Sequence, residues 1–168
     1  MSHAFAPPAT FPDEASRYAA LHQELAGLLT DERDWLVNLA NMTALLALRL
    51  PELNWVGFYL WRGGELVLGP FQGKPACVRL QLGRGVCGTA AARRATVLVP
   101  EVHAFPGHIA CDAASASELV VPLVAGERLL GVLDLDSPRR ARFTVADQTG
   151  LEACCALLLT ATDWPGHW

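Results

Sequence analysis

Residues 54–70, NWVGFYLWRGGELVLGP, decide the fold because they are the first part of the chain with the pattern of a β-hairpin. Two runs rich in β-branched and aromatic residues stand on either side of Gly63 and Gly64, and adjacent glycines permit a tight turn between antiparallel strands. Trp55 and Tyr59 are four residues apart and therefore share one face of the first strand. The hairpin predicts that the chain is built around an antiparallel sheet.

Further extended segments follow this hairpin. Strands are expected at residues 77–83 (CVRLQLG) and 96–100 (TVLVP), and in a second hairpin at residues 119–137 (LVVPLVAGERLLGVLDLDS) that turns near Gly126. A short Ala-rich helix is expected at residues 85–94 (GVCGTAAARR), and a long loop runs from Glu101 to about Ala116. These segments bring the sheet to about five or six strands.

Two helices are expected before the sheet. Residues 13–31 and 31–51 carry apolar side chains at every third or fourth position, which is the spacing of one helix face. Asp31 or Asp34 can cap the start of the second helix, and Pro51 ends it.

A last helix is expected at residues 143–162, where Thr144 and Asp147 have the spacing of a capping box. Helices at both ends of a chain can together cover one face of an antiparallel sheet. The sequence therefore predicts an α+β fold with the terminal helices on one face. The short helix and the long loop would cover a pocket on the other face.

Composition limits the classes of function. The chain has 168 residues, 52% of them hydrophobic, which suits one domain over residues 13–168 after a mobile tail at residues 1–12. The net charge of -4 and the absence of a Lys/Arg cluster argue against a nucleic-acid partner. No apolar run is long enough to cross a membrane, and no secretory signal is seen, so a cytoplasmic location is expected.

The five cysteines are an odd number, and a reducing compartment disfavours a permanent disulfide framework. Cys154 and Cys155 lie in the apolar run ACCALLL, where buried core positions are expected. Cys77 has Lys74 and Arg79 nearby, and Cys87 stands at the start of the short helix. Cations and helix N-termini lower the pKa of a thiol, which favours thiolate at both positions.

Cys111 has the setting of a reactive thiol, because it lies in the long loop beside His108 and Asp112 and upstream of Glu118. A zinc site is one alternative, with His103, His108 and Cys111 as ligands and Cys77 or Cys87 as a fourth, although the paired CxxC spacing of structural zinc is missing. A Cys-His hydrolase is another. Further thiols nearby instead favour a cycle in which an oxidised nucleophile is rescued by a second cysteine.

Three carboxylates are expected to gather at one end of the sheet. Asp134 and Asp136 alternate along one strand and share a face, while Leu133 and Leu135 take the core side. The partner strand of the same hairpin begins just after Glu118. A solvated strand end would explain the two Asp residues, but the cluster also suits a ligand with an ammonium group or a reaction that needs a carboxylic acid proton.

The segments that carry this chemistry resemble a known family. They are NWVGFYL (54–60), LGPFQGKPACVRL (68–80), GRGVCGTAA (83–91), VPEVHAFPGHIACDAASASELVVPL (99–123) and GVLDLDS (131–137). Together they are similar to the free methionine-(R)-sulfoxide reductases, which are built on the GAF fold. The similarity extends from about Ala19 to Leu158 and is most specific between Pro70 and Leu123.

The resemblance implies roles for these residues. It assigns the catalytic roles to Cys111 as nucleophile, Cys77 as the usual resolving thiol, Cys87 as an auxiliary or alternative thiol, and Glu118 as a carboxylic acid. It assigns substrate binding to Trp55, Tyr59, Glu118, Asp134 and Asp136, although the two aromatic residues also suit a core. Free methionine sulfoxide would be the substrate and thioredoxin the reductant, with neither metal nor organic cofactor, and a homodimer is suggested. A ligand-sensing GAF module without turnover and a zinc protein are the alternatives.

Overall fold

The computed structural model describes residues 11–107 and 112–166, so most of the expected N-terminal tail lies outside the described residues. The helices are α1 (Glu14–Leu29), α2 (Trp35–Arg49), α3 (Gly85–Arg93) and α4 (Val145–Ala161), with a 3-10 turn at Val102–Ala104. The strands are β1 (Trp55–Arg62), β2 (Glu65–Gly73), β3 (Arg79–Leu80), β4 (Val97–Val99), β5 (Ser117–Ala125) and β6 (Arg128–Ser137).

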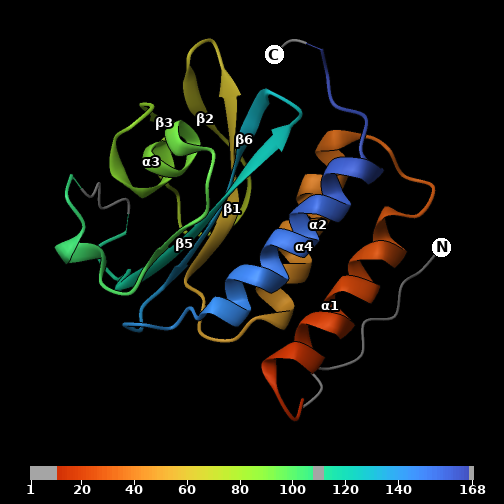
Figure 1. Cartoon of the computed structure of the whole chain (residues 1–168), viewed down its shortest axis with the longest axis horizontal. Coiled ribbons are helices and arrows are strands. Elements are labelled where there is room, and N and C mark those ends of the chain that lie inside the picture. The colour runs from red at the N-terminus through yellow and green to blue at the C-terminus, as the bar shows by residue number, and fades with distance from the viewer. Residues whose placement is uncertain (1–10, 108–111, 167–168) are drawn as a thin grey trace.

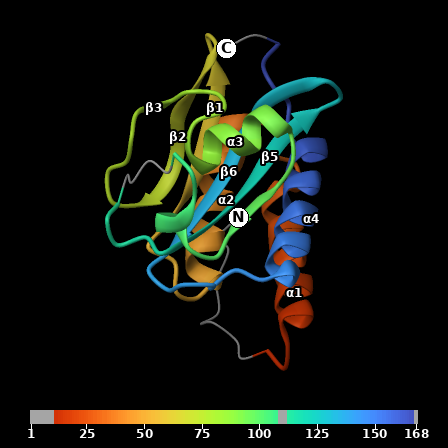
Figure 2. The ribbon, with the colours of Figure 1, turned by 60° about the vertical axis from the view of Figure 1, so that its left-hand side comes forward.

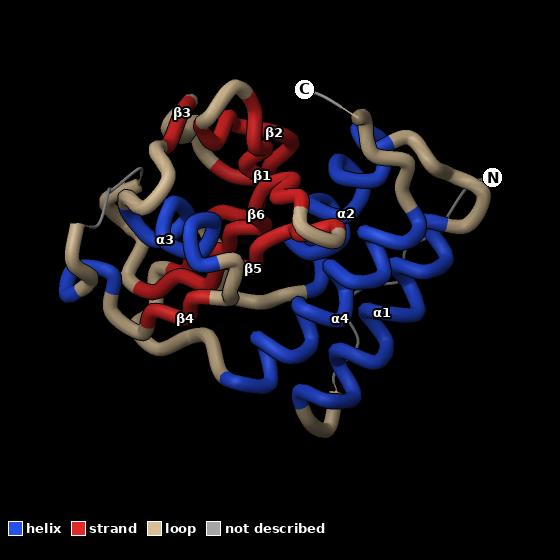
Figure 3. Tube along the Cα trace, turned by 45° about the horizontal axis from the view of Figure 1, so that its top comes forward, coloured by secondary structure: helices blue, strands red, loops and turns tan. Residues whose placement is uncertain are grey.

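The six strands form one antiparallel sheet in the order β3-β2-β1-β6-β5-β4. Helices α1, α2 and α4 cover one face, and α3 lies over the other (Figures 1 and 2). The tube view shows the same sequence of layers, with the sheet between the three long helices and α3 (Figure 3). The α+β prediction is therefore confirmed, including the placement of the terminal helices on one face.

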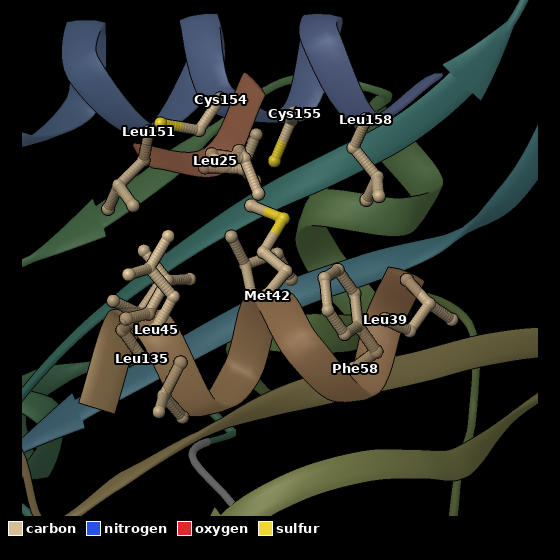
Figure 4. Close-up of a cluster of buried hydrophobic side chains, with 14 of the residues drawn as sticks. Leu25, Leu39, Met42, Leu45, Phe58, Leu135, Leu151, Cys154, Cys155 and Leu158 are labelled. Atoms are coloured by element: carbon tan, nitrogen blue, oxygen red, sulfur yellow. The ribbon is translucent and has the colours of Figure 1, made fainter. Parts of the chain in front are cut away.

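The main core lies between the three long helices and the sheet. Leu25, Met42, Leu135 and Cys154 are packed there with almost no exposed surface (Figure 4). Full burial of one such Leu or Met side chain stabilises the fold by about 1.5–3 kcal/mol. Cys154 and Cys155 project from α4 into this layer, as expected for structural thiols.

The helix boundaries follow side-chain caps. Asp34, not Asp31, caps α2, because its carboxylate accepts the N–H groups of Leu36 and Val37. Thr144 and Asp147 form the expected capping box at the start of α4. Satisfied N–H groups at these positions stop each helix from fraying at its first turn.

The expected strand at residues 77–83 is much shorter in the structure, where β3 covers only Arg79–Leu80. The chain turns directly afterwards, because Gln81 O accepts the N–H of Arg84 and Gly83 donates to Gly88 O. This turn delivers the chain into α3, so the residues after β3 cannot continue the ladder.

A buried ion pair holds the ends of β5 and β6 in place. The Arg142 guanidinium lies 3.2 Å from the Asp147 carboxylate, which also accepts the Tyr18 hydroxyl at 2.8 Å. The backbone N–H of Arg142 donates to Ser117 Oγ, next to Glu118. Breaking a buried pair of this kind on one side is costly, so the pair helps to keep Arg142 beside the start of β5.

No helix among the described residues is long and apolar enough to cross a membrane.

Candidate active site

A pocket of about 570 Å³, including its mouth, opens on the sheet face that α3 covers. Its floor is formed by β1, β5 and β6, and its sides by residues 74–76, the start of α3 and the turn at residues 112–115. All five residues predicted to bind substrate line this pocket: Trp55, Tyr59, Glu118, Asp134 and Asp136. The predicted position of the pocket is therefore confirmed.

The three carboxylates meet on the floor because of strand register. Glu118 on β5 lies directly opposite Asp136 on β6, and Asp134 follows two residues along on the same face. Cys87 reaches the same point from the first turn of α3, with its Sγ 3.9 Å from Glu118 Oε1. The expected cluster exists, and Glu118 and Asp134 are buried, not solvated.

The three carboxyl groups differ in acidity. Burial raises the pKa of Glu118 well above its usual range, and the charges of Asp134 and Asp136 raise it further. Burial, followed by the charge of Asp136, raises the pKa of Asp134 in the same direction. Burial raises the pKa of Asp136 only to about 6, because a hydrogen bond from Ser115 opposes the effect. Near pH 7 Asp136 is therefore the carboxylate of the three that most readily carries a charge.

The expected thiolate at Cys87 is wrong. Burial raises the pKa of this thiol well above its usual value, and the nearby charges of Asp134 and Glu118 add to the rise. The helix N-terminus acts in the opposite direction, but its effect is small beside burial and two carboxyl groups. Cys87 is therefore a protonated thiol at neutral pH.

Trp55 and Tyr59 stack against each other on one wall of the pocket, with ring centroids 5.8 Å apart. Gly57 between them leaves room for this wall, since a Cβ there would lie 2.5 Å from the Trp55 ring. Both side chains also hold the segment beside them: Trp55 Nε1 donates to Lys74 O at 3.1 Å, and Tyr59 Oη donates to Cys77 O at 3.0 Å.

A polar network at the mouth was not predicted. Asn54 Nδ2 donates to Asp112 Oδ2 at 3.2 Å and to Ser115 Oγ at 3.1 Å. Asp112 also lies 3.3 Å from Lys74 Nζ, so it joins the segment before Cys77 to the turn after Cys111. The N–H of Ala114 and these side chains lower the pKa of Asp112. Asn54 directly precedes β1 and is next to Trp55, and this position was the sequence signal that could have indicated a residue at the pocket mouth.

The other predicted sulfur and imidazole residues are more scattered. Cys77 is disulfide-bonded, whereas Cys87, Cys154 and Cys155 are free thiols. Cys111 and His108 lie outside the described residues, so the proposed nucleophile and the zinc alternative stay predictions. His103 lies in the 3-10 turn and is not among the residues that line the pocket.

Comparison with known proteins identifies first the domain family of the chain and then its similar relatives. The GAF domain model matches residues 21–161, which is most of the chain, so the chain belongs to the GAF domain family. Among curated proteins, it is 52% identical over 150 residues to the free methionine-R-sulfoxide reductase of Escherichia coli, covering 88% of this chain and 91% of that protein. It is 42% identical to the Saccharomyces cerevisiae protein of the same name, covering 79% of this chain and 78% of that one.

A solved structure agrees with these relatives. The free methionine-R-sulfoxide reductase of Neisseria meningitidis, determined in complex with its substrate, superposes with a TM-score of 0.90 and 43% identity, covering 95% of each chain. Within the GAF domain family, this chain is a member of the free methionine-R-sulfoxide reductases.

Proposed function

We propose that the pocket reduces free L-methionine-(R)-sulfoxide to methionine, with Cys111 as nucleophile and thioredoxin as the final reductant. The observation that carries this proposal is the buried cluster of Glu118, Asp134 and Asp136 beside the Trp55–Tyr59 wall. The family to which the chain belongs is named for reduction of this substrate. The cluster offers both a proton and a negative charge, which this substrate needs at opposite ends.

The first chemical step needs one thiolate and one acid. The Cys111 thiolate attacks the sulfoxide sulfur while the Glu118 carboxyl gives its proton to the sulfoxide oxygen. That oxygen ends on Cys111 as a sulfenic acid, and the sulfoxide sulfur gains two electrons and leaves as the thioether of methionine. The raised pKa of Glu118 supports this role, because a carboxyl group protonated near pH 7 has a proton to give.

The second step restores the thiols. The Cys77 thiol condenses with the Cys111 sulfenic acid, forming a disulfide and releasing one water molecule. A reduced dithiol of thioredoxin then exchanges with this disulfide and leaves both cysteines as thiols. Cys77 suits this role because its segment borders the pocket and is held there through its own carbonyl by Tyr59.

Substrate binding divides between the remaining groups. Asp136, with a pKa of about 6, is the carboxylate suited to pair with the substrate ammonium at neutral pH. Trp55 and Tyr59 offer an apolar wall for the methyl and thioether end. The first turn of α3 lines the pocket and has no side-chain cap among the described residues, so its N–H groups suit the substrate carboxylate.

Substrate form tests the proposal. Free L-methionine-(R)-sulfoxide is expected to react at least about a hundredfold faster, in kcat/KM, than a peptide containing the same sulfoxide. A peptide bond removes the ammonium and leaves a buried carboxylate unpaired. The measurement is methionine release by chromatography, with the S epimer as the stereochemical control. Equal rates on the peptide would contradict the assigned role of the carboxylates. Binding of the free amino acid without methionine release would favour a sensing GAF module.

The resolving role of Cys77 has its own test. Cys77→Ser is expected to release about one methionine per chain and then stop, because the first step needs only the nucleophilic cysteine. Thioredoxin-coupled NADPH oxidation should fall to a small fraction of the wild-type rate. Cys154→Ser is the control and should sustain turnover, since this thiol lies in the core on the opposite sheet face. Full turnover in Cys77→Ser, with a mass-mapped Cys87–Cys111 bond, would assign the resolving role to Cys87.

A further inference from the structure

The floor of the pocket brings together three groups that can ligate a metal ion. Cys87 Sγ and one carboxylate oxygen each from Glu118 and Asp134 all lie within 4.8 Å of one another, and all three residues are buried. The two carboxylates come from neighbouring strands and the thiol from α3, so rigid elements fix all three.

One atom in this cluster lacks a partner. Asp134 is only 6% exposed, and its Oδ1 is buried without a hydrogen-bond partner. Cys87 and Glu118 form hydrogen bonds with the Asp134 carboxyl group, but Oδ1 is left over, and an unpartnered buried oxygen of this kind costs free energy. Among the residues that the structure describes, no salt bridge involves Glu118, Asp134 or Asp136.

We propose that Cys87, Glu118 and Asp134 form a zinc-binding site, and that a bound zinc ion inhibits the reaction in this pocket. One thiolate and two carboxylates suit a borderline-soft cation such as Zn²⁺ better than Mg²⁺ or Ca²⁺, which prefer oxygen ligands alone. Tetrahedral zinc holds sulfur and oxygen ligands about 3.5 Å apart, given its usual bond lengths. The Cys87 Sγ to Glu118 Oε1 distance of 3.9 Å needs little adjustment to meet this.

Binding displaces protons and involves no redox change. The Cys87 thiol and any protonated carboxyl group lose their protons to solvent as the metal takes their place. The zinc alternative that the sequence raised used His103, His108 and Cys111, with Cys77 or Cys87 as a fourth ligand, so the two sites share at most Cys87. The inhibitory consequence rests on the proposed function, because the metal would occupy Glu118 as proton donor and Asp134 beside the ammonium subsite.

Metal titration tests the site without reference to activity. The titration uses the double variant Cys77→Ser/Cys111→Ser. This variant lacks the two other cysteines to which catalytic roles are assigned, and it keeps Cys87. Co²⁺ is expected to produce a thiolate-to-cobalt charge-transfer band that saturates at one equivalent and disappears on addition of Zn²⁺. Zn²⁺ should also raise the thermal unfolding midpoint of this protein.

Matched variants identify the ligands. In the same background, Cys87→Ser should abolish the band, and Asp134→Asn should weaken Co²⁺ binding by at least about tenfold. Cys155→Ala is the control and should keep both band and affinity, because Cys155 projects from α4 into the opposite core. Circular dichroism checks that each variant is folded. A band that survives Cys87→Ser, or an unchanged affinity in Asp134→Asn, would overturn the proposal.

The inhibition is measured separately. Zn²⁺ should suppress a single turnover of methionine release by wild-type protein, and a chelator should restore it. Measuring methionine directly avoids metal binding to thioredoxin. Stoichiometric Zn²⁺ binding without loss of the turnover would overturn the inhibitory role. A protein that binds zinc at these residues but never releases methionine would refute the proposed function and leave the metal site standing.

Discussion

Replacing Cys111 with serine is expected to abolish methionine sulfoxide reduction, including the single turnover that Cys77→Ser retains. A serine hydroxyl is not ionised at neutral pH, and it cannot take up the sulfoxide oxygen as a thiolate does when it becomes a sulfenic acid. Loss of the nucleophile removes the whole first step, so the fall should reach the background rate.

The other thiols are unsuited to replace it. Cys87 is in the pocket, but burial and two carboxyl groups raise its pKa, so it is protonated. Burial also raises the pKa of Cys154, to about 11, and that of Cys155. Both of these lie on the opposite side of the sheet.

The measurement is methionine released per chain from the purified, reduced variant, without thioredoxin. Cys154→Ser is the matched control and should release the wild-type amount. Substrate affinity of Cys111→Ser, measured by calorimetry, should be close to that of wild type, since the proposed binding groups are unchanged. Release of one methionine per chain by Cys111→Ser would mean that a different thiol is the nucleophile.

Replacing Glu118 with glutamine is expected to lower kcat by about a hundredfold or more, the usual contribution of a general acid. The amide keeps the shape of the side chain but has no carboxylic proton to give. Asp134 and Asp136, whose charges raise the pKa of Glu118, stay in place in this variant. The loss should appear in single turnover, where recycling by thioredoxin plays no part.

The dependence on pH follows from the raised pKa of Glu118. Because the protonated form acts, the wild-type rate of the first step should fall as pH rises through the pKa of the carboxylate cluster. Glu118→Gln should lose this decline while keeping any dependence that comes from the nucleophilic thiol. Asp134→Asn serves as the comparison. A single-turnover rate unchanged in Glu118→Gln would transfer the role of proton donor to Asp134 or Asp136.

Local pattern was enough to predict most of the fold. The alternation of Asp134 and Asp136 with Leu133 and Leu135 placed the acids on the pocket face and the leucines in the core, as the structure has them. Strand alternation depends only on neighbouring residues, so one sequence carries that information. The predicted strand at residues 77–83 is too long, because a hydrogen bond between Gly83 and Gly88 turns the chain after β3.

Contacts between distant residues were the harder part. The acidity of Cys87 depends on Asp134 and Glu118, which are more than thirty residues away along the chain, and on its burial between α3 and the sheet. Helix position alone predicted the opposite direction. The bridge from Asn54 to Asp112 and Ser115 similarly requires the sheet to be folded before its partners meet.

The hydrogen bonds that Trp55 and Tyr59 send to the carbonyls of Lys74 and Cys77 restrict how this pocket can be redesigned. The same two rings form the wall against which the substrate would lie. Any substitution that widens the wall to admit a bulkier sulfoxide therefore also releases the main chain that carries Cys77. With Cys77 as the resolving thiol, as proposed, a broader substrate range would come with slower recycling unless a new anchor for residues 74–77 were built at the same time.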